Sequence, residues 1–259
     1  MNEKNKTSKN SIPNKNICYF ILYFACFLIG GLVSTGQSLA QSTSPSHTME
    51  WYRKDAAAGK RRAMVNIGWL YYQGDGVPQD YTKAMEWYRK DAAAGKRLAM
   101  VNIGVFYANG DGVPQDYTKA MEWYRKAAAA GNGNAMNNIG AFYANGQSVP
   151  QNYTKAMAWY HKGAEAGSGL AMNNIGAFYA KGQSVPQDYT KAMEWYRKAA
   201  AAGKGRAMIN IGVLYANGDG VPQNYTKAKY WFRKAERHGS PQTFKYAKKL
   251  LTKMAAEGH

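Results

Sequence analysis

The stretch that decides the fold is RLAMVNIGVFYANGDGVPQDYTKAMEWYRKAAAAGN, from Arg97 to Asn132. Copies of it begin at Arg61, Arg97, Gly133, Gly169 and Gly205, so the period is 36 residues. One methionine and one tryptophan recur at the same two positions of every copy. The two columns are Met64, Met100, Met136, Met172 and Met208, and Trp87, Trp123, Trp159, Trp195 and Trp231. A fixed period of this length predicts a stacked array of short units rather than one globular core.

Each unit carries two helical patterns separated by a turn. The apolar spacing within residues 99–107 predicts a first helix, helix A, with a wide apolar face. The run Gly-Asp-Gly-Val-Pro-Gln, which begins at Gly110, ends this helix. Asp116 is placed to cap a second helix, helix B, whose apolar spacing covers residues 117–128 before Gly131 closes it. The sequence therefore predicts a helix–turn–helix unit.

Glycine recurs inside helix A, where it costs about 1 kcal/mol relative to alanine. The column is Gly68, Gly104, Gly140, Gly176 and Gly212. A close approach between the two helices of a unit would explain a bare backbone at this position. We expect a ring of helix B, either Trp123 or Tyr124, to lie over Gly104.

Many positions of the unit recur at fixed spacing. In the copy quoted above they are Ala99, Gly104, Tyr107, Gly110, Gly112, Val113, Asp116, Lys119, Ala120, Trp123, Lys126, Ala127, Ala128 and Gly131. This pattern resembles the Sel-one-like repeat family, helix–turn–helix relatives of the tetratricopeptide repeats, from Met49 to about Leu251. The resemblance implies an all-α fold, a right-handed α/α superhelical solenoid that serves as a binding scaffold. Mild departures are Ser148, Ser184, Asn152, Asn224 and Gly163.

The first 40 residues have the features of a secretory signal peptide. Lysines precede an apolar run from Cys18 to Val33, and Ser38-Leu39-Ala40 offers small residues for cleavage after Ala40. At 16 residues the run is short for a spanning helix, and an uncleaved membrane anchor is the alternative. Both cysteines lie in the leader. We therefore expect a periplasmic or secreted protein with no disulfide and, after cleavage, no membrane span.

After the leader, residues 41–60 comprise a short linker and an N-terminal half-repeat, because Met49 to Arg61 repeats as Met85 to Arg97 without a change. This half-repeat is a helix B without its helix A. Five full repeats follow, and residues 241–259 form a closing half-repeat with lysines on its outer side. The full repeats are 61–96, 97–132, 133–168, 169–204 and 205–240.

The chain is strongly basic, with a formal net charge of +18. Cleavage after residue 40 removes four lysines and one glutamate and leaves +15. We expect no nucleic-acid partner, because the sequence has no recognised nucleic-acid motif and an exported protein meets little nucleic acid. An anionic envelope polymer or an acidic protein is the expected target of this charge.

No catalytic or metal-binding constellation stands out. The four histidines, at positions 47, 161, 238 and 259, lack the His-Glu-x-x-His spacing of a helical zinc site. Cysteine-rich members of the family have been linked to β-lactam binding, so the resemblance implies a β-lactam-binding or hydrolysing enzyme as one alternative. The mature chain, however, has neither cysteine nor a Ser-x-x-Lys sequence. We expect no enzyme, no catalytic residue, no cofactor and no metal.

Two loop motifs have both a ligand interpretation and a structural one. The Asn-Gly-Asp-Gly runs at Asn109 and Asn217 resemble the start of a calcium loop, but the later ligands are missing, which favours turn formation. The sequences Asn152-Tyr-Thr and Asn224-Tyr-Thr match the glycosylation sequon. Aspartate takes the same place in the other repeats, so we interpret both asparagines as helix caps.

Helix A offers the most informative candidate surface. Asparagine holds one column on the side away from the apolar face, and two neighbouring columns vary between repeats. In tetratricopeptide-like superhelices this side lines a concave groove, and we predict that it binds a protein or peptide partner. The predicted groove residues are Asn66, Trp69, Gln73, Asn102, Val105, Asn109, Asn138, Asn145, Asn174, Lys181, Asn210 and Asn217.

Two alternatives remain open for these surfaces. The asparagine column could instead form an amide ladder between neighbouring repeats. The basic side of helix B could make the chain an envelope-binding protein that grips anionic lipid or glycan. Trp69 is the only tryptophan outside the helix B column, and we expect it to be exposed on helix A.

Overall fold

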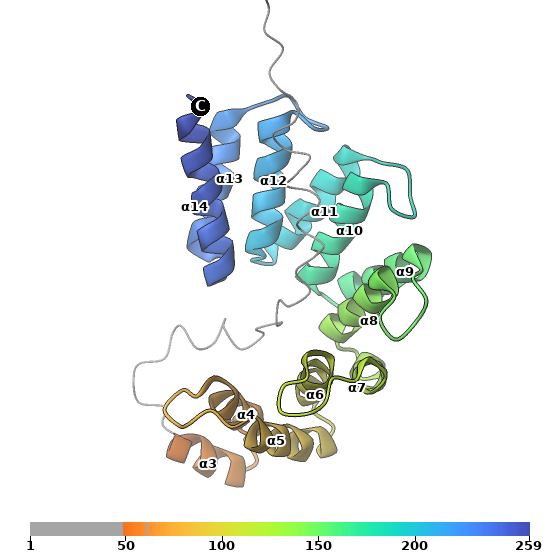
Figure 1. Ribbon diagram of the computed structural model, residues 1–259, viewed down its shortest axis with the longest axis vertical. Coiled ribbons are helices and arrows are strands. Elements are labelled where there is room, and N and C mark those ends of the chain that lie inside the picture. Colours follow the sequence, from red (N-terminus) through yellow and green to blue (C-terminus); the bar gives the residue numbers. More distant parts are fainter. Residues whose placement is uncertain (1–48, 61) are drawn as a thin grey trace, which may run out of the picture. The chain divides into compact units, whose positions relative to one another are not determined.

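The computed structural model describes residues 49–60 and 62–259, which form short helices joined by tight loops (Figure 1). The expected leader, its cleavage site and the linker before residue 49 lie outside these residues. The described part contains twelve helices and no strand, so the predicted all-α solenoid is confirmed. The A-type helices are α4 (Ala63–Gln73), α6 (Arg97–Asn109), α8 (Gly133–Asn145), α10 (Gly169–Lys181), α12 (Gly205–Asn217) and α14 (Pro241–Ala256). The B-type helices are α3 (Met49–Ala57), α5 (Tyr81–Ala93), α7 (Tyr117–Ala129), α9 (Tyr153–Glu165), α11 (Tyr189–Ala201) and α13 (Tyr225–His238).

The ends of the helices follow the local chemistry of the unit. Helix α6 stops at Gly110, which has a φ of 80° and donates its N–H to the carbonyl of Phe106. Helix α7 starts after Asp116, whose side chain accepts a bond from the backbone N–H of Lys119 (2.9 Å). Asn152 and Asn224 cap α9 and α13 in the same way, as expected.

The loop between the two helices is held by its glutamine. Nε2 of Gln115 donates to the carbonyl of Ala108 (2.8 Å), near the end of α6. The equivalent bonds are made by Gln79, Gln151, Gln187 and Gln223. This bond ties the start of helix B to the end of helix A, so every unit turns in the same way.

Within a unit the two helices meet at the glycine column. A Cβ placed on Gly104 would lie 2.5 Å from Cε1 of Tyr124 and could not fit there. Tyr124 is buried, whereas Trp123 remains partly exposed. The ring over Gly104 is therefore that of Tyr124, and the expected close approach is confirmed.

Between units, aromatic rings form the core. Tyr124, on α7, meets Phe142 of the next repeat edge to face, with centroids 5.5 Å apart. Ile103 and its equivalents are fully buried as well. Each helix packs mainly on its neighbours in sequence, which is how a repeat array buries a continuous core. No helix among the described residues has the length and apolar character that a membrane span requires.

The two ends of the described array differ from the interior. Helix α3 is a B-type helix without an A-type partner among the described residues. Helix α14 is an A-type helix, and it extends to Ala256, beyond Leu251, near which the family resemblance ends. Lys248 occupies its glycine column, and its side chain is exposed together with those of Lys245 and Lys249. Three lysines of α14 are therefore exposed at this end of the described array, and the role of α14 as a closing half-repeat stays a prediction.

Candidate functional site

The predicted groove residues all lie on one side of the A-type helices, which we call the helix-A face. Steps of three and four residues keep them in line along each helix. None of the twelve is fully buried, and Gln73, Asn109 and Asn145 are exposed. The structure thus brings the predicted residues together on one face. The concave shape implied by the resemblance stays a prediction.

The asparagine column forms a ladder of amide hydrogen bonds between neighbouring repeats. Nδ2 of Asn174 donates to Oδ1 of Asn137 (2.9 Å), and Asn210 donates in the same way to Asn173 (3.1 Å). Within each repeat, Asn137 donates to Asn138 (3.3 Å) and Asn173 to Asn174 (3.5 Å). These bonds link three consecutive A-type helices.

The same column also bonds tyrosines of the preceding B-type helix. The amide of Asn102 hydrogen-bonds the hydroxyl of Tyr88, and that of Asn138 hydrogen-bonds Tyr124. Burial raises the pKa of both tyrosines, and the amide acts on it in the opposite direction. A buried hydroxyl needs a partner, and the asparagine supplies it. The ladder therefore explains the asparagine column without a bound peptide.

Sequence reasoning missed Asn137 and Asn173, which complete the ladder. Both are buried, with 6% of their surface exposed. The same column holds Val65, Val101 and Ile209 in the other repeats. Polar residues in two copies of an otherwise apolar column were the signal in the sequence that could have revealed them.

Trp69 differs from the expectation that it is exposed. It is partly buried and stacks on Tyr72, with ring centroids 5.7 Å apart and an interplanar angle of 22°. Both rings belong to the hydrophobic cluster that also contains Met49 and Tyr52 of the opening half-repeat. The expectation was wrong because Tyr72, which packs against Phe106 of the next repeat, covers part of the tryptophan ring.

Two variable columns on the helix-A face stand beside the ladder. The first is Trp69, Val105, Ala141, Ala177 and Val213, and the second is Gln73, Asn109, Asn145, Lys181 and Asn217. All except Val213 keep accessible surface. Nδ2 of Asn109 donates to Asp111 (3.0 Å), and Asn217 makes the same bond to Asp219 (2.9 Å). These bonds support turn formation as the role of the Asn-Gly-Asp-Gly loops.

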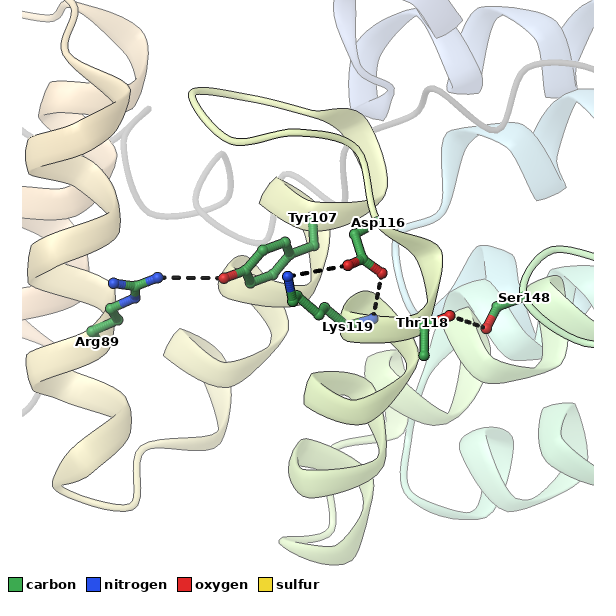
Figure 2. A network of polar contacts seen from close by, with 6 residues as sticks. All are labelled: Arg89, Tyr107, Asp116, Thr118, Lys119 and Ser148. Carbon is green, nitrogen blue, oxygen red and sulfur yellow. Dashed lines mark hydrogen bonds and ion pairs between the residues drawn. The ribbon is translucent and has the colours of Figure 1, made fainter.

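On the other side of repeats 1, 2 and 5, a tyrosine of helix A lies between an arginine and a lysine. In repeat 2, Nη2 of Arg89 donates to the hydroxyl of Tyr107 (3.3 Å), and Nζ of Lys119 lies 5.6 Å from its ring centroid (Figure 2). Asp116 forms an ion pair with Lys119 (3.2 Å). The hydrogen bond from the backbone N–H of Lys119 is the main cause that lowers the pKa of Asp116. Figure 2 also shows Thr118 and Ser148 joining adjacent repeats through their hydroxyls.

The tryptophan column of helix B is covered in a regular way. Nζ of Lys126 lies 4.5 Å from the ring centroid of Trp123, and each repeat has this pair. Such pairs hold the lysine stem over the ring and leave its charge in water.

His161 contacts the ring of Trp195 in the next repeat. In residues 49–60 and 62–259, no three His, Cys, Asp or Glu side chains gather as they would around a metal.

Comparison with known families and structures identifies relatives of this chain. A family model described as Sel1 repeat matches residues 61–96, 97–132, 133–168, 169–204 and 205–240. Comparison with curated proteins gave no match.

Solved structures similar to this one include two proteins at the same identity. A Sel1 repeat protein from Oxalobacter formigenes is 34% identical, with 76% of this chain and 81% of that chain covered and a TM-score of 0.66. The protective antigen c5321 of uropathogenic Escherichia coli, which displays an SLR fold, is 34% identical over 75% of this chain and 42% of its own, with a TM-score of 0.59.

A more distant similarity concerns the fold alone. The immunity protein Pa5087 from Pseudomonas aeruginosa is 19% identical, with 88% of this chain and 85% of that chain covered and a TM-score of 0.60.

Proposed function

Because this chain belongs to the Sel1 repeat family, whose members are generally scaffolds for protein–protein interaction, we propose that it binds a partner polypeptide through the helix-A face. No catalytic step is part of this proposal. The leader sequence supports action in the periplasm or outside the cell.

The observation that carries the proposal is a contrast between columns on this face. The asparagine column is the same in every repeat and is occupied by internal hydrogen bonds. The two columns beside it vary in size and charge, from Ala141 to Trp69 and from Asn145 to Lys181. The invariant column fixes the spacing of the A-type helices, and the variable columns beside it remain accessible. A preorganised recognition surface needs both features. Side chains already held in place lose less conformational entropy on binding.

The ladder also changes which residues are proposed to contact the partner. Asn102, Asn138, Asn174 and Asn210 have roles in the stack, so we assign them to the scaffold of the face. Side-chain recognition falls to the variable columns. A polypeptide that crosses several A-type helices would contact, in each repeat, one side chain from each of the two variable columns.

Site-specific photo-cross-linking in cells that naturally produce the protein tests this proposal. A photoreactive amino acid replaces Asn145, exposed at the end of α8, or Ala158, exposed on α9 of the same repeat. We expect one defined polypeptide to be captured from position 145 and not from position 158. Capture from position 158 alone would contradict the proposal, because it would place the interface on the B-type helices.

A further inference from the structure

The lysine beside each helix A tyrosine has carboxylate neighbours in repeats 1, 2 and 4. Asp116 pairs with Lys119, and the same pairs are Asp80 with Lys83 (3.0 Å) and Asp188 with Lys191 (3.4 Å). A glutamate also follows each of these lysines by three residues, which makes the two side chains neighbours on the helix surface. These glutamates are Glu86, Glu122 and Glu194. The protein itself therefore neutralises the lysine in these repeats.

Repeat 5 keeps the cations and lacks both carboxylates. Nη2 of Arg197 donates to the hydroxyl of Tyr215 (3.3 Å), and Nζ of Lys227 lies 5.4 Å from the centroid of the same ring. Asn224 replaces the capping aspartate, and its oxygen is engaged by the backbone N–H of Lys227. Tyr230 replaces the glutamate and is 54% exposed. We call Arg197, Tyr215 and Lys227 the repeat-5 cluster.

The charges around the repeat-5 cluster are mostly positive. Glu194, on α11, follows Lys191 by three residues and stands three before Arg197 and four before Lys198, so three cations share one carboxylate. On α13, the only acidic residue is Glu236, two and a half helical turns beyond Lys227. The cations that follow Lys227 on that helix are Lys229, Arg233, Lys234 and Arg237.

We propose that the repeat-5 cluster binds a phosphate group. The guanidinium of Arg197 has several donors in a planar fork, and the ammonium of Lys227 adds a mobile charge. Because the Tyr215 oxygen accepts the arginine bond, its O–H remains free to donate. These donors come from three different helices and suit an anion with three accessible oxygens. Charge-assisted bonds to phosphate are about twice as strong as neutral ones.

Repeat 3 shows that the absence of carboxylates is not enough to make a site like that of repeat 5. Asn152 and Ala158 stand in place of its aspartate and glutamate. Lys155 lies 5.6 Å from the ring centroid of Tyr143, but Arg125 is not hydrogen-bonded to that tyrosine in the described structure. Repeat 5 alone combines the arginine–tyrosine bond with a lysine that lacks both acidic neighbours. The proposed site goes beyond the binding of a polypeptide by the helix-A face.

Titration of the protein with inorganic phosphate, followed by NMR of the arginine Nε–Hε groups, tests the proposal. We expect a saturable shift of the Arg197 signal that chloride at equal ionic strength does not produce. The double variant Asn224→Asp with Tyr230→Glu restores the carboxylates of repeat 2. It should weaken phosphate binding by about ten-fold or more, the effect of losing one charge-assisted contact.

The opposite exchange in repeat 2 is the matched control. Asp116→Asn with Glu122→Tyr leaves Arg89, Tyr107 and Lys119 in place and should create a second phosphate-sensitive arginine signal at Arg89. Both exchanges use residues that already occupy these columns in this chain, so the helices should keep their circular dichroism spectrum. The proposal would be overturned if the Asn224→Asp, Tyr230→Glu variant showed the same phosphate-induced shift of the Arg197 signal. It would also be overturned if chloride produced an equal shift.

Vesicles identify the source of the phosphate group. Phosphatidic acid in a phosphatidylcholine vesicle presents a phosphomonoester at a lipid surface. If the phosphate belongs to a headgroup, the protein should bind these vesicles and not pure phosphatidylcholine vesicles, and inorganic phosphate should release it. Phosphate binding without vesicle binding would assign the site to a soluble phosphate ester. Vesicle binding that the repeat-5 exchange leaves unchanged would contradict the headgroup assignment.

Discussion

Gly104 and Tyr124 show how one missing side chain sets the distance between two helices. The sequence indicated a ring over the glycine but left Trp123 and Tyr124 as alternatives, because both lie on helix B and differ by only one position. Packing on the next repeat decides between them: Tyr124 is buried against Phe142, whereas Trp123 lies under Lys126 at the surface.

Gly104→Ala should destabilise the protein by about 1–3 kcal/mol, since its Cβ would overlap the tyrosine ring. Urea unfolding measures this cost. In a Tyr124→Leu background, which removes the ring, the same change should cost about 1 kcal/mol less. An equal cost in both backgrounds would show that the ring is not the obstacle.

Asp91 is a buried carboxylate, with 5% of its surface exposed, in a column that holds Ala127, Ala199 and Ala235 elsewhere. Burial raises the pKa of Asp91, and the charge of Lys96 acts in the opposite direction. An acid whose pKa is higher in the folded state binds protons more tightly there. The ionised carboxylate therefore destabilises the folded state. This effect develops as the pH rises from the pKa of Asp91 in the unfolded chain through its higher pKa in the folded protein.

Asp91→Ala should accordingly stabilise the protein by about 1 kcal/mol at pH 7. The gain should shrink as the pH falls through the raised folded-state pKa and should vanish below about 4, where the carboxyl becomes protonated in both states. Thermal melts of the variant and the natural protein across this pH range measure the difference. Glu86→Ala removes an exposed carboxylate from the same helix and should change stability by less than about 0.5 kcal/mol. A loss of stability in Asp91→Ala would contradict the argument.

At the scale of the helix, local signals predicted most of what the structure has. Gly110 ends α6 and Asp116 starts α7 through contacts within a few residues, and such contacts can be recognised in a single unit. The amide ladder joins side chains 37 positions apart, such as Asn137 and Asn174, and no pattern inside one unit specifies it. The exposure of Trp69 was misjudged because Tyr72 of the same helix stacks on its ring, and the spacing of apolar residues does not specify that contact.

The ladder predicts a cost for removing one of its members. Asn138→Ala takes a hydrogen-bond partner from the buried hydroxyl of Tyr124 and from the amide of Asn137, and should cost about 1–3 kcal/mol. Asn145→Ala changes an exposed asparagine of the same helix and should cost less than about 0.5 kcal/mol. Thermal denaturation of the two variants side by side makes the comparison. Equal melting temperatures would mean that the ladder adds nothing to stability.

For the whole array, nearest-neighbour packing predicts that a complete repeat can be removed. Deletion of residues 133–168 joins Asn132 to Gly169 and brings α10 onto α7. Phe178 then takes the place of Phe142 against Tyr124, and the asparagine pair of repeat 4 replaces that of repeat 3. We expect a folded helical protein whose circular dichroism per residue is unchanged.

Deletion of residues 133–150 is the matched control, because it removes α8 and leaves α9 without its partner. Tyr160 then loses the glycine on which it packs, and the variant should lose cooperative unfolding. If both deletions unfold the protein equally, stacking of independent units does not describe this chain.

Lys248 has a consequence for how such a chain can grow. Another helix B after α14 would have to set its aromatic ring where this lysine has its Cβ. The same obstacle meets α3 of a second molecule, which has no A-type partner among residues 49–60 and 62–259 and would otherwise complete the last unit and begin a fibre. A helix B placed directly after α14 would lack the bare backbone on which its ring must pack, whereas a unit duplicated inside the array keeps its own glycine.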